Sequence, residues 1–185
     1  MPEQKQEQTQ EQKNTRWTTL VALSTAAMAV LAALTTLYMG KFSSRTILAQ
    51  AQESDQWNFY QAKSIKGHTY VMQKQFLELQ LMGMKGRQRD VAEKYEKTIH
   101  GYDENIKRYD KEKKEISDKA EALEKEKGIS QTRGGKFAFG LIFLQIAIML
   151  SSIAVITKKR PLWYMGLALS SAGLFFFMDG FWLFY

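Results

Sequence analysis

The chain has 185 residues, of which 45% are hydrophobic and 24% are charged, and its formal net charge at pH 7 is +7. It contains no cysteine, which excludes disulfides, thiolate–metal sites and a cysteine nucleophile. The basic residues are interleaved with acidic ones instead of forming a stripe, so we expect no nucleic-acid partner. The apolar and charged residues are separated into blocks, and this pattern predicts membrane spans joined to a solvated segment.

Residues 1–16 are rich in Gln and Glu and show no apolar periodicity. Such a segment cannot bury enough apolar surface to offset its ordering entropy, so we predict a disordered polar tail. Residues 17–39 form the first apolar block, and about 20 residues suffice to cross a bilayer as a helix. The block follows Lys13 and Arg16 as a signal peptide would, but it exceeds the ~7–15 residues of a signal core. We therefore interpret it as the first transmembrane helix.

Residues 41–134 carry most of the charge, with Lys, Arg, Asp and Glu alternating in sign. Gly83 and Gly86 predict a chain reversal with its tip near 83–87. The two arms on either side have matched lengths of ~60 Å at 1.5 Å per residue. The segment is therefore predicted to be an extramembrane, antiparallel helical hairpin that resembles a coiled coil. Gly128 and Gly134–Gly135 are expected to break the second arm before the membrane.

Each arm shows a seam in which positions recur at alternating spacings of three and four, as in coiled coils. The seam of the first arm is Ala62, Ile65, Thr69, Met72, Phe76 and Leu79. The seam of the second arm is Tyr102, Ile106, Tyr109, Lys113, Ile116, Ala120 and Leu123. Folding the hairpin about its tip pairs Ala62 with Tyr109 and Phe76 with Tyr95, so the two seams are predicted to pack against each other.

Two further apolar blocks, residues 137–156 and 162–183, are predicted to be the second and third transmembrane helices. The short loop between them contains Lys158, Lys159 and Arg160, and cations in short loops stay in the cytoplasm. This places the amino terminus in the cytoplasm and the hairpin on the periplasmic side. The fold class is thus an all-α membrane protein with three transmembrane helices and a long antiparallel hairpin between the first and second.

Polar and small residues in the predicted spans have several interpretations. Asp179 lies near the outer end of the third span, which favours an interfacial position, and an ion pathway is the alternative. Gln145 in the second span is expected to form a hydrogen bond between helices. Small residues at four-residue or similar spacing predict close helix packing, within one chain or between chains: Ala22, Ala26, Ala29, Ala33, Gly166, Ser170 and Gly173.

No pattern in the sequence supports catalysis. His68 and His100 fall at nearly matched heights on the two arms, but zinc normally takes three or four protein ligands, so we predict no metal site. The chain has no P-loop, no nucleophile elbow, no metalloprotease box and no dinucleotide fingerprint. We therefore expect that the chain is not an enzyme, and we identify no cofactor and no small-molecule substrate.

Three segments, SDQWNFYQAKSIK (54–66), KRYDKEKKEI (107–116) and the apolar stretch 144–181, resemble an uncharacterised bacterial membrane-protein family, domain of unknown function 4337. The resemblance implies the architecture and a bacterial inner-membrane location, and it implies no reaction. Folding the two arms about the predicted tip places the first two segments opposite each other. The candidate interaction patch there is Trp57, Tyr60, Gln61, Lys63, Lys66, Arg108, Tyr109, Asp110 and Lys111. The alternative is that these groups only lock the hairpin.

The sequence favours a non-enzymatic, membrane-anchored scaffold or accessory subunit that acts through helix–helix and hairpin-mediated protein association. Its expected partners are membrane lipids and either copies of itself or the other subunits of a membrane protein complex. The alternative is an oligomeric ion channel or ion-coupled transporter component with Asp179 in the third span.

Overall fold

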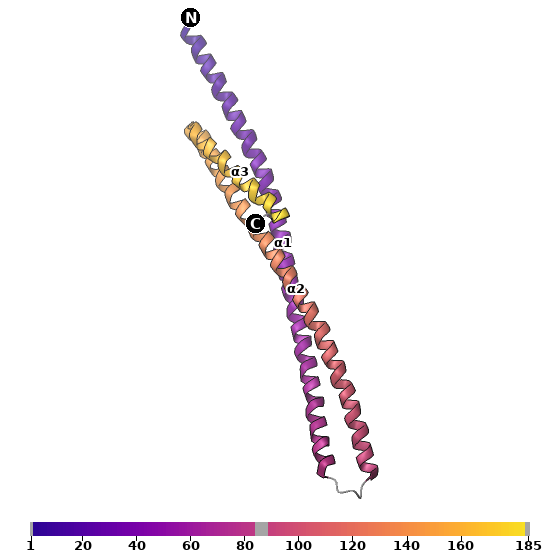
Figure 1. The fold of residues 1–185 in the computed structure, drawn as a ribbon. Coiled ribbons are helices and arrows are strands. Elements are labelled where there is room, and N and C mark those ends of the chain that lie inside the picture. Colours follow the sequence, from indigo (N-terminus) through magenta and orange to yellow (C-terminus); the bar gives the residue numbers. More distant parts are fainter. Residues whose placement is uncertain (1, 84–88, 184–185) are drawn as a thin grey trace. The chain divides into compact units, whose positions relative to one another are not determined.

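A computed structural model describes residues 2–83 and 89–183, with side chains from residue 15 onward. It consists of three helices, α1 (Pro2–Gly83), α2 (Arg89–Thr157) and α3 (Arg160–Trp182), and no strand occurs among the described residues (Figure 1). Each helix contains a stretch that is long and apolar enough to cross a membrane. The all-helical class predicted from the apolar blocks and the heptad-like seams is confirmed.

The predicted spans and hairpin arms are not separate helices. The first span and the first arm both belong to α1, and the second arm and the second span both belong to α2. The predicted break at Gly128 and Gly134–Gly135 is wrong, because these residues are helical. A glycine inside a helix costs only about 1 kcal/mol relative to alanine, which neighbouring turns with good helix formers can absorb. No described glycine has a positive φ.

The amino-terminal segment also differs from its prediction. Residues 2–16, expected to be disordered, are helical and form the first turns of α1. Gln, Glu and Lys are good helix formers, and extending a helix that is already nucleated by an apolar span is far easier than starting one. At the predicted hairpin tip, Gly83 is the last residue of α1, and residues 84–87 lie outside the described part of the chain.

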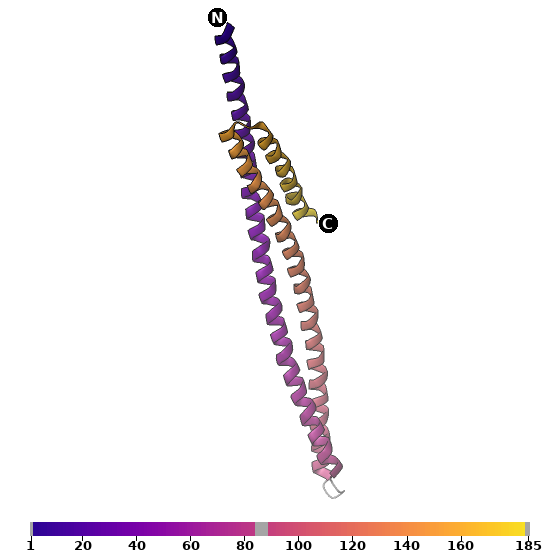
Figure 2. The same cartoon turned by 90° about the vertical axis from the view of Figure 1, so that its left-hand side faces the viewer.

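The chain divides into two compact units. The first unit comprises residues 1–46 and 128–185, and the second, the hairpin unit, comprises residues 47–127. In the first unit α3 folds back beside the carboxyl-terminal part of α2 (Figure 2). The reversal is short because Lys158 adopts a left-handed conformation with φ 54° and Pro161 lies in the first turn of α3.

The first unit is held together by contacts among all three helices. One face of α1 is buried through Trp17, Val21, Met28 and Ala32. The indole Nε1 of Trp163 on α3 donates a hydrogen bond to Ser24 Oγ on α1 at 3.1 Å. These contacts attach the start of α3 to the apolar stretch of α1.

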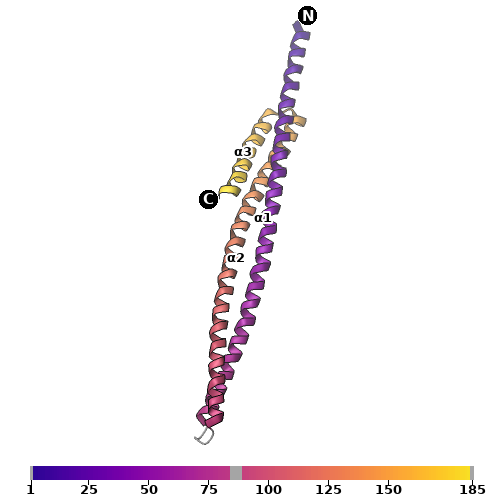
Figure 3. The same ribbon diagram turned by 90° about the vertical axis from the view of Figure 1, so that its right-hand side faces the viewer.

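In the hairpin unit α1 and α2 run antiparallel and side by side (Figure 3). Contacts between distant parts of the sequence set this pairing: Lys63 lies against Glu112, and Lys74 against Asp103. The residue number increases along one helix as it decreases along the other, which is the signature of an antiparallel pair.

Candidate functional site

The inner face of the hairpin is formed by a seam on each helix. On α2 the predicted seam, from Tyr102 to Leu123, is buried or half-buried throughout, and this prediction is confirmed. On α1 the residues turned toward α2 are a different set, repeating at three- and four-residue spacing: Glu53, Gln56, Tyr60, Lys63, Gly67, Tyr70, Lys74 and Leu77. The inner seam of α1 is therefore largely polar or aromatic.

Three ion pairs connect the two arms through these seam positions. Lys63 Nζ lies 2.6 Å from Glu112 Oε2, and Lys74 Nζ lies 2.7 Å from Asp103 Oδ1. Lys127 Nζ pairs with Glu53 Oε2 in the same way. All six side chains retain some solvent exposure, so each pair contributes little stability by itself, but together they specify which residues lie opposite each other.

The ion pairs shift the pKa values of their members. The hydrogen bond from Lys74 lowers the pKa of Asp103, and the same bond raises the pKa of Lys74. The Lys63 ammonium lowers the pKa of Glu112, with a smaller contribution from Arg108. In each case the charged form is favoured, so these carboxylates stay ionised at neutral pH.

Tyrosines fill the seam between the ion pairs. The ring of Tyr70 on α1 stacks against that of Tyr109 on α2 at 5.8 Å and also contacts Tyr102 at 5.5 Å. Lys63 and Arg108 both lie over the ring of Tyr109, 5.3 Å and 5.1 Å from its centre. Gly67 opposite Tyr109 leaves room for the two helices to approach.

The structure brings together only part of the predicted interaction patch. Lys63, Arg108 and Tyr109 form the cation–π group across the two arms. Trp57 and Tyr60 contact each other edge to face at 5.6 Å on α1. The other members are exposed on the outer sides of their helices: Gln61, Lys66, Asp110 and Lys111. The described contacts among these residues fit the alternative interpretation, in which they lock the hairpin.

The predicted seam of the first arm is wrong, because its residues are exposed and not packed into the interior of the hairpin. Ile65, Met72, Phe76 and Leu79 are between 60% and 69% exposed. Ala62 and Thr69 lie on the same exposed face. We call these six residues the outer stripe. The alternating three- and four-residue spacing of these residues marks the outer face of the hairpin and not its interior.

The pairing of the arms is also shifted from the predicted one. Tyr109 was expected opposite Ala62, whereas its contacts are with Lys63 and Tyr70, and Gly67 lies against its Cβ. Tyr95, expected opposite Phe76, donates its hydroxyl to Gln80 Oε1 at 3.1 Å. The two sequence segments nevertheless face each other as predicted, through Lys63 and Glu112.

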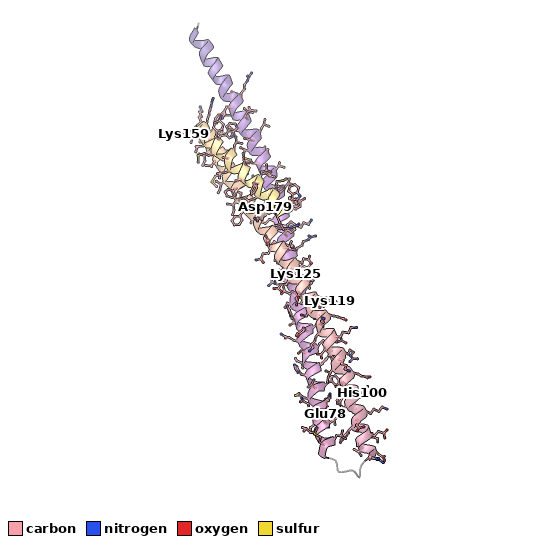
Figure 4. The ribbon with its side chains drawn as sticks, viewed as in Figure 1. Glu78, His100, Lys119, Lys125, Lys159 and Asp179 are labelled. Atoms are coloured by element: carbon pink, nitrogen blue, oxygen red, sulfur yellow. The ribbon has the colours of Figure 1, made fainter. Side chains whose placement is uncertain are left out.

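In the first unit the predicted polar residues have different surroundings. Asp179 lies near the carboxyl-terminal end of α3 (Figure 4), where its side chain is only 1% exposed and its Oδ2 lies 2.7 Å from Lys136 Nζ on α2. The expected access of water to the carboxylate is therefore wrong, whereas its interfacial depth in a membrane stays a prediction. The sequence clue to this pair was a lysine immediately before the second span, at the level where the antiparallel third span ends. Gln145 is exposed on α2 and not buried between helices as expected.

An aromatic cluster surrounds the Asp179 end of α3. Phe137 of α2 is fully buried and contacts the rings of Tyr38, Phe177 and Phe181 at 5.6, 5.7 and 5.2 Å. A Cβ added to Gly180 would come within 2.7 Å of the Phe137 ring. The three helices are therefore tightly packed beside the end of α3 that carries the buried carboxylate.

The small residues of α3 serve packing within this chain. A Cβ at Gly173 would lie 2.8 Å from Leu144 Cγ, and one at Gly166 would lie 3.0 Å from Ser151 Oγ, both on α2. Ala22, Ala26, Ala29 and Ala33 of α1 are instead exposed. The predicted close helix packing within one chain is therefore observed for the glycines of α3.

The histidines and the grooves of the hairpin are the remaining candidates for a binding site. They contain no group of three or more His, Cys, Asp or Glu side chains able to hold a metal ion. His68 is exposed, and His100 is exposed with Nδ1 3.7 Å from Glu104. A shallow groove of about 470 Å³ lies on the hairpin beside Gln56, Phe59 and Leu123.

These features define a class of all-helical protein with three helices of membrane-span length and a helical hairpin. Residues 17–183 match the family described as a domain of unknown function (DUF4337), and the chain belongs to this family. Searches of curated proteins and of solved structures found no match to the chain.

Proposed function

We propose that this chain is a non-enzymatic scaffold or accessory subunit, anchored in a membrane by three helices, that acts through helix–helix and hairpin-mediated protein association. The observation that carries the proposal is the outer stripe. Four large apolar side chains of this stripe are mostly exposed along one face of a helix outside the apolar spans. Soluble surfaces rarely keep such a contiguous patch uncovered, and patches of this kind mark interaction sites.

The proposed location is a bacterial inner membrane, with the amino terminus in the cytoplasm and the hairpin in the periplasm. Lys158, Lys159 and Arg160 at the turn between α2 and α3 support this orientation. A cysteine-free chain permits a direct test with single cysteines and a membrane-impermeant maleimide applied to intact cells. Labelling of Glu104→Cys but not of Lys158→Cys supports the orientation, and the reverse pattern overturns it.

Oligomeric mass tests the proposed function itself. The chain is extracted in native lipid nanodiscs and analysed by native mass spectrometry. A homo-oligomer or a complex with other proteins is the expected result. A monomer that carries no other protein would contradict the proposal.

The alternative function, a pore lined by the third span, needs Asp179 to face water. The carboxylate is instead buried against Lys136, a position suited to a structural ion pair. Ion flux into liposomes that is unchanged by Asp179→Asn would remove the main residue on which the alternative depends. A loss of flux would favour it over the scaffold.

A further inference from the structure

The outer stripe has the geometry of half a coiled coil. Its six residues alternate three and four apart from Ala62 to Leu79, so they occupy successive a and d positions. Phe59 and Met82 extend the exposed apolar surface at its two ends. On one side the stripe continues into a groove of about 420 Å³, lined by Thr69, Met72, Gln73, Phe76, Leu77 and Tyr102. Knobs of this pattern fit holes on another helix.

We propose that the occupant of this face is a second copy of the same chain, with the two α1 arms parallel and in register. This inference deepens the proposed function and rests on it. In every copy inserted the same way, the first arm runs from the membrane toward the hairpin tip. Two copies therefore present their stripes in the same direction, and each stripe residue meets its own equivalent.

The charge on the two flanks of the stripe favours a second copy. The flanking e and g positions are Gln61, Lys66, His68, Gln73, Gln75 and Gln80. In a parallel pair these positions meet as Gln61 with Lys66, His68 with Gln73, and Gln75 with Gln80, so no two like charges face each other. Coiled coils that select a different partner commonly do so with several charges at these positions, whereas here Lys66 is the single Lys, Arg, Asp or Glu among them.

The rest of the hairpin surface contrasts with this face. On α2 the exposed residues at a comparable level include Glu104, Lys107, Arg108 and Lys111. Two copies meeting there in a parallel arrangement would repeat like charges along the contact, which is unfavourable. The neutral, apolar face is thus the one on which a copy of the chain can dock without repulsion.

The exposed area is sufficient for a stable pair. Phe59, Ile65, Met72, Phe76, Leu79 and Met82 are each at least 58% exposed. Aromatic side chains present ~150–250 Å², and with the lower end of that range taken for all six, each leaves ~100 Å² to cover, or roughly 600 Å² per copy. The pair would bury about 1,200 Å² in total, the lower limit for specific interfaces.

Disulfide trapping tests the contact, because the natural chain has no cysteine. Met72→Cys places a thiol at a d position of the stripe. Glu104→Cys is the matched control, at the same level of the hairpin because its neighbour Asp103 pairs with Lys74, but exposed on α2. A disulfide needs its two Cα atoms within ~4.4–6.8 Å of each other. Equivalent d positions of the two copies in a parallel pair are that close, whereas the two copies of the control residue are not. Mild oxidation in native membranes is expected to convert Met72→Cys to a covalent dimer and leave Glu104→Cys monomeric.

The nanodisc mass of the same preparations separates failure of this inference from failure of the proposed function. A homo-oligomer without selective trapping at residue 72 overturns the stripe contact and leaves the scaffold proposal standing. A complex with a different protein, without trapping at residue 72, likewise overturns the stripe contact and leaves the scaffold proposal standing. A monomer without any partner overturns both.

A second variant removes the apolar contact without touching the inner seam. Ile65→Gln/Met72→Gln changes two exposed side chains, so the hairpin is expected to keep its helicity. The dissociation constant of the homodimer should rise roughly tenfold or more, from the apolar area withdrawn from the contact. An unchanged dissociation constant with intact helicity would overturn the stripe as the contact surface.

Discussion

The ion pair between Lys136 and Asp179 allows a prediction in which the two partners are not equivalent. The Asp179 side chain is 1% exposed, whereas that of Lys136 is 20% exposed. Lys136→Met removes the ammonium that faces the buried Asp179 carboxylate, and breaking a buried ion pair by removing one partner costs ~3–5 kcal/mol. Asp179→Asn leaves an ammonium on a flexible stem that can turn toward water, so its cost should be nearer ~1–3 kcal/mol.

The double variant Lys136→Met/Asp179→Asn should be more stable than Lys136→Met alone, because it no longer buries a carboxylate from which the facing ammonium has been removed. The measurement is unfolding of the purified chain in mixed micelles with increasing sodium dodecyl sulfate, followed by tryptophan fluorescence and circular dichroism. Lys159→Met, which removes an exposed cation near the start of α3 (Figure 4), is the control and should change stability little. Additive single effects, or an Asp179→Asn variant less stable than Lys136→Met, would refute the reasoning.

Three further predictions concern the hairpin and the helix contacts. Lysine partners lower the pKa values of Asp103 and Glu112, so their ion pairs stabilise the hairpin fully above the ordinary pKa values of 3.8 and 4.5. This stabilisation is lost as the pH falls through the lowered pKa values. The melting temperature of the hairpin, followed by circular dichroism, should therefore drop at acidic pH, and it should drop less in Asp103→Asn/Glu112→Gln. Gly173→Ala should destabilise the first unit by ~1–3 kcal/mol, because the added methyl group would clash with α2. Gly135→Ala is the control and should not destabilise it, because the added methyl group meets open space. Equal effects of the two substitutions in detergent unfolding would contradict this packing. Gly101→Ala also meets open space inside α2 and should stabilise the hairpin by ~1 kcal/mol, measured in the same melting experiment.

The sequence predicted the helices well because their signals are local. Long apolar blocks and alternating charges identify helices of membrane-span length and helical arms without knowledge of their neighbours. The seam of α2 was identified for a related reason, since Tyr102, Tyr109 and Ala120 combine the right spacing with large or small residues suited to close packing. Such patterns do not depend on which helix lies opposite.

The face of α1 and the pairing of the arms could not be predicted in the same way. An apolar stripe shows which residues avoid water, but it does not show what covers them, so the outer stripe was assigned to the hairpin interior. The interior of α1 uses Lys63, Tyr70 and Lys74, whose suitability depends on Glu112, Tyr109 and Asp103 of the other arm. The pairing was predicted by folding the arms symmetrically about a central tip, and the ion pairs place it a few residues away.

Asp179 shows the same limit in the first unit. Its depth was estimated from the number of residues in the third span alone, which gave a position near water. Burial was decided instead by Lys136 and by the aromatic cluster around Phe137, which belong to other helices. Only the antiparallel arrangement of α2 and α3 brings these groups together.

The distribution of polar and apolar residues over the hairpin has a consequence for its stability. The inner seam is joined by partly exposed ion pairs such as Lys63 with Glu112, which contribute little free energy each but specify pairing. The large apolar side chains that could contribute most, including Phe76 and Leu79, lie on the outside. Covering them would add ~1.5–3 kcal/mol for each side chain fully buried. Under the proposed pairing, the order of the hairpin and the binding of the second copy should therefore be coupled, because covering the outer stripe adds free energy that the uncovered hairpin lacks.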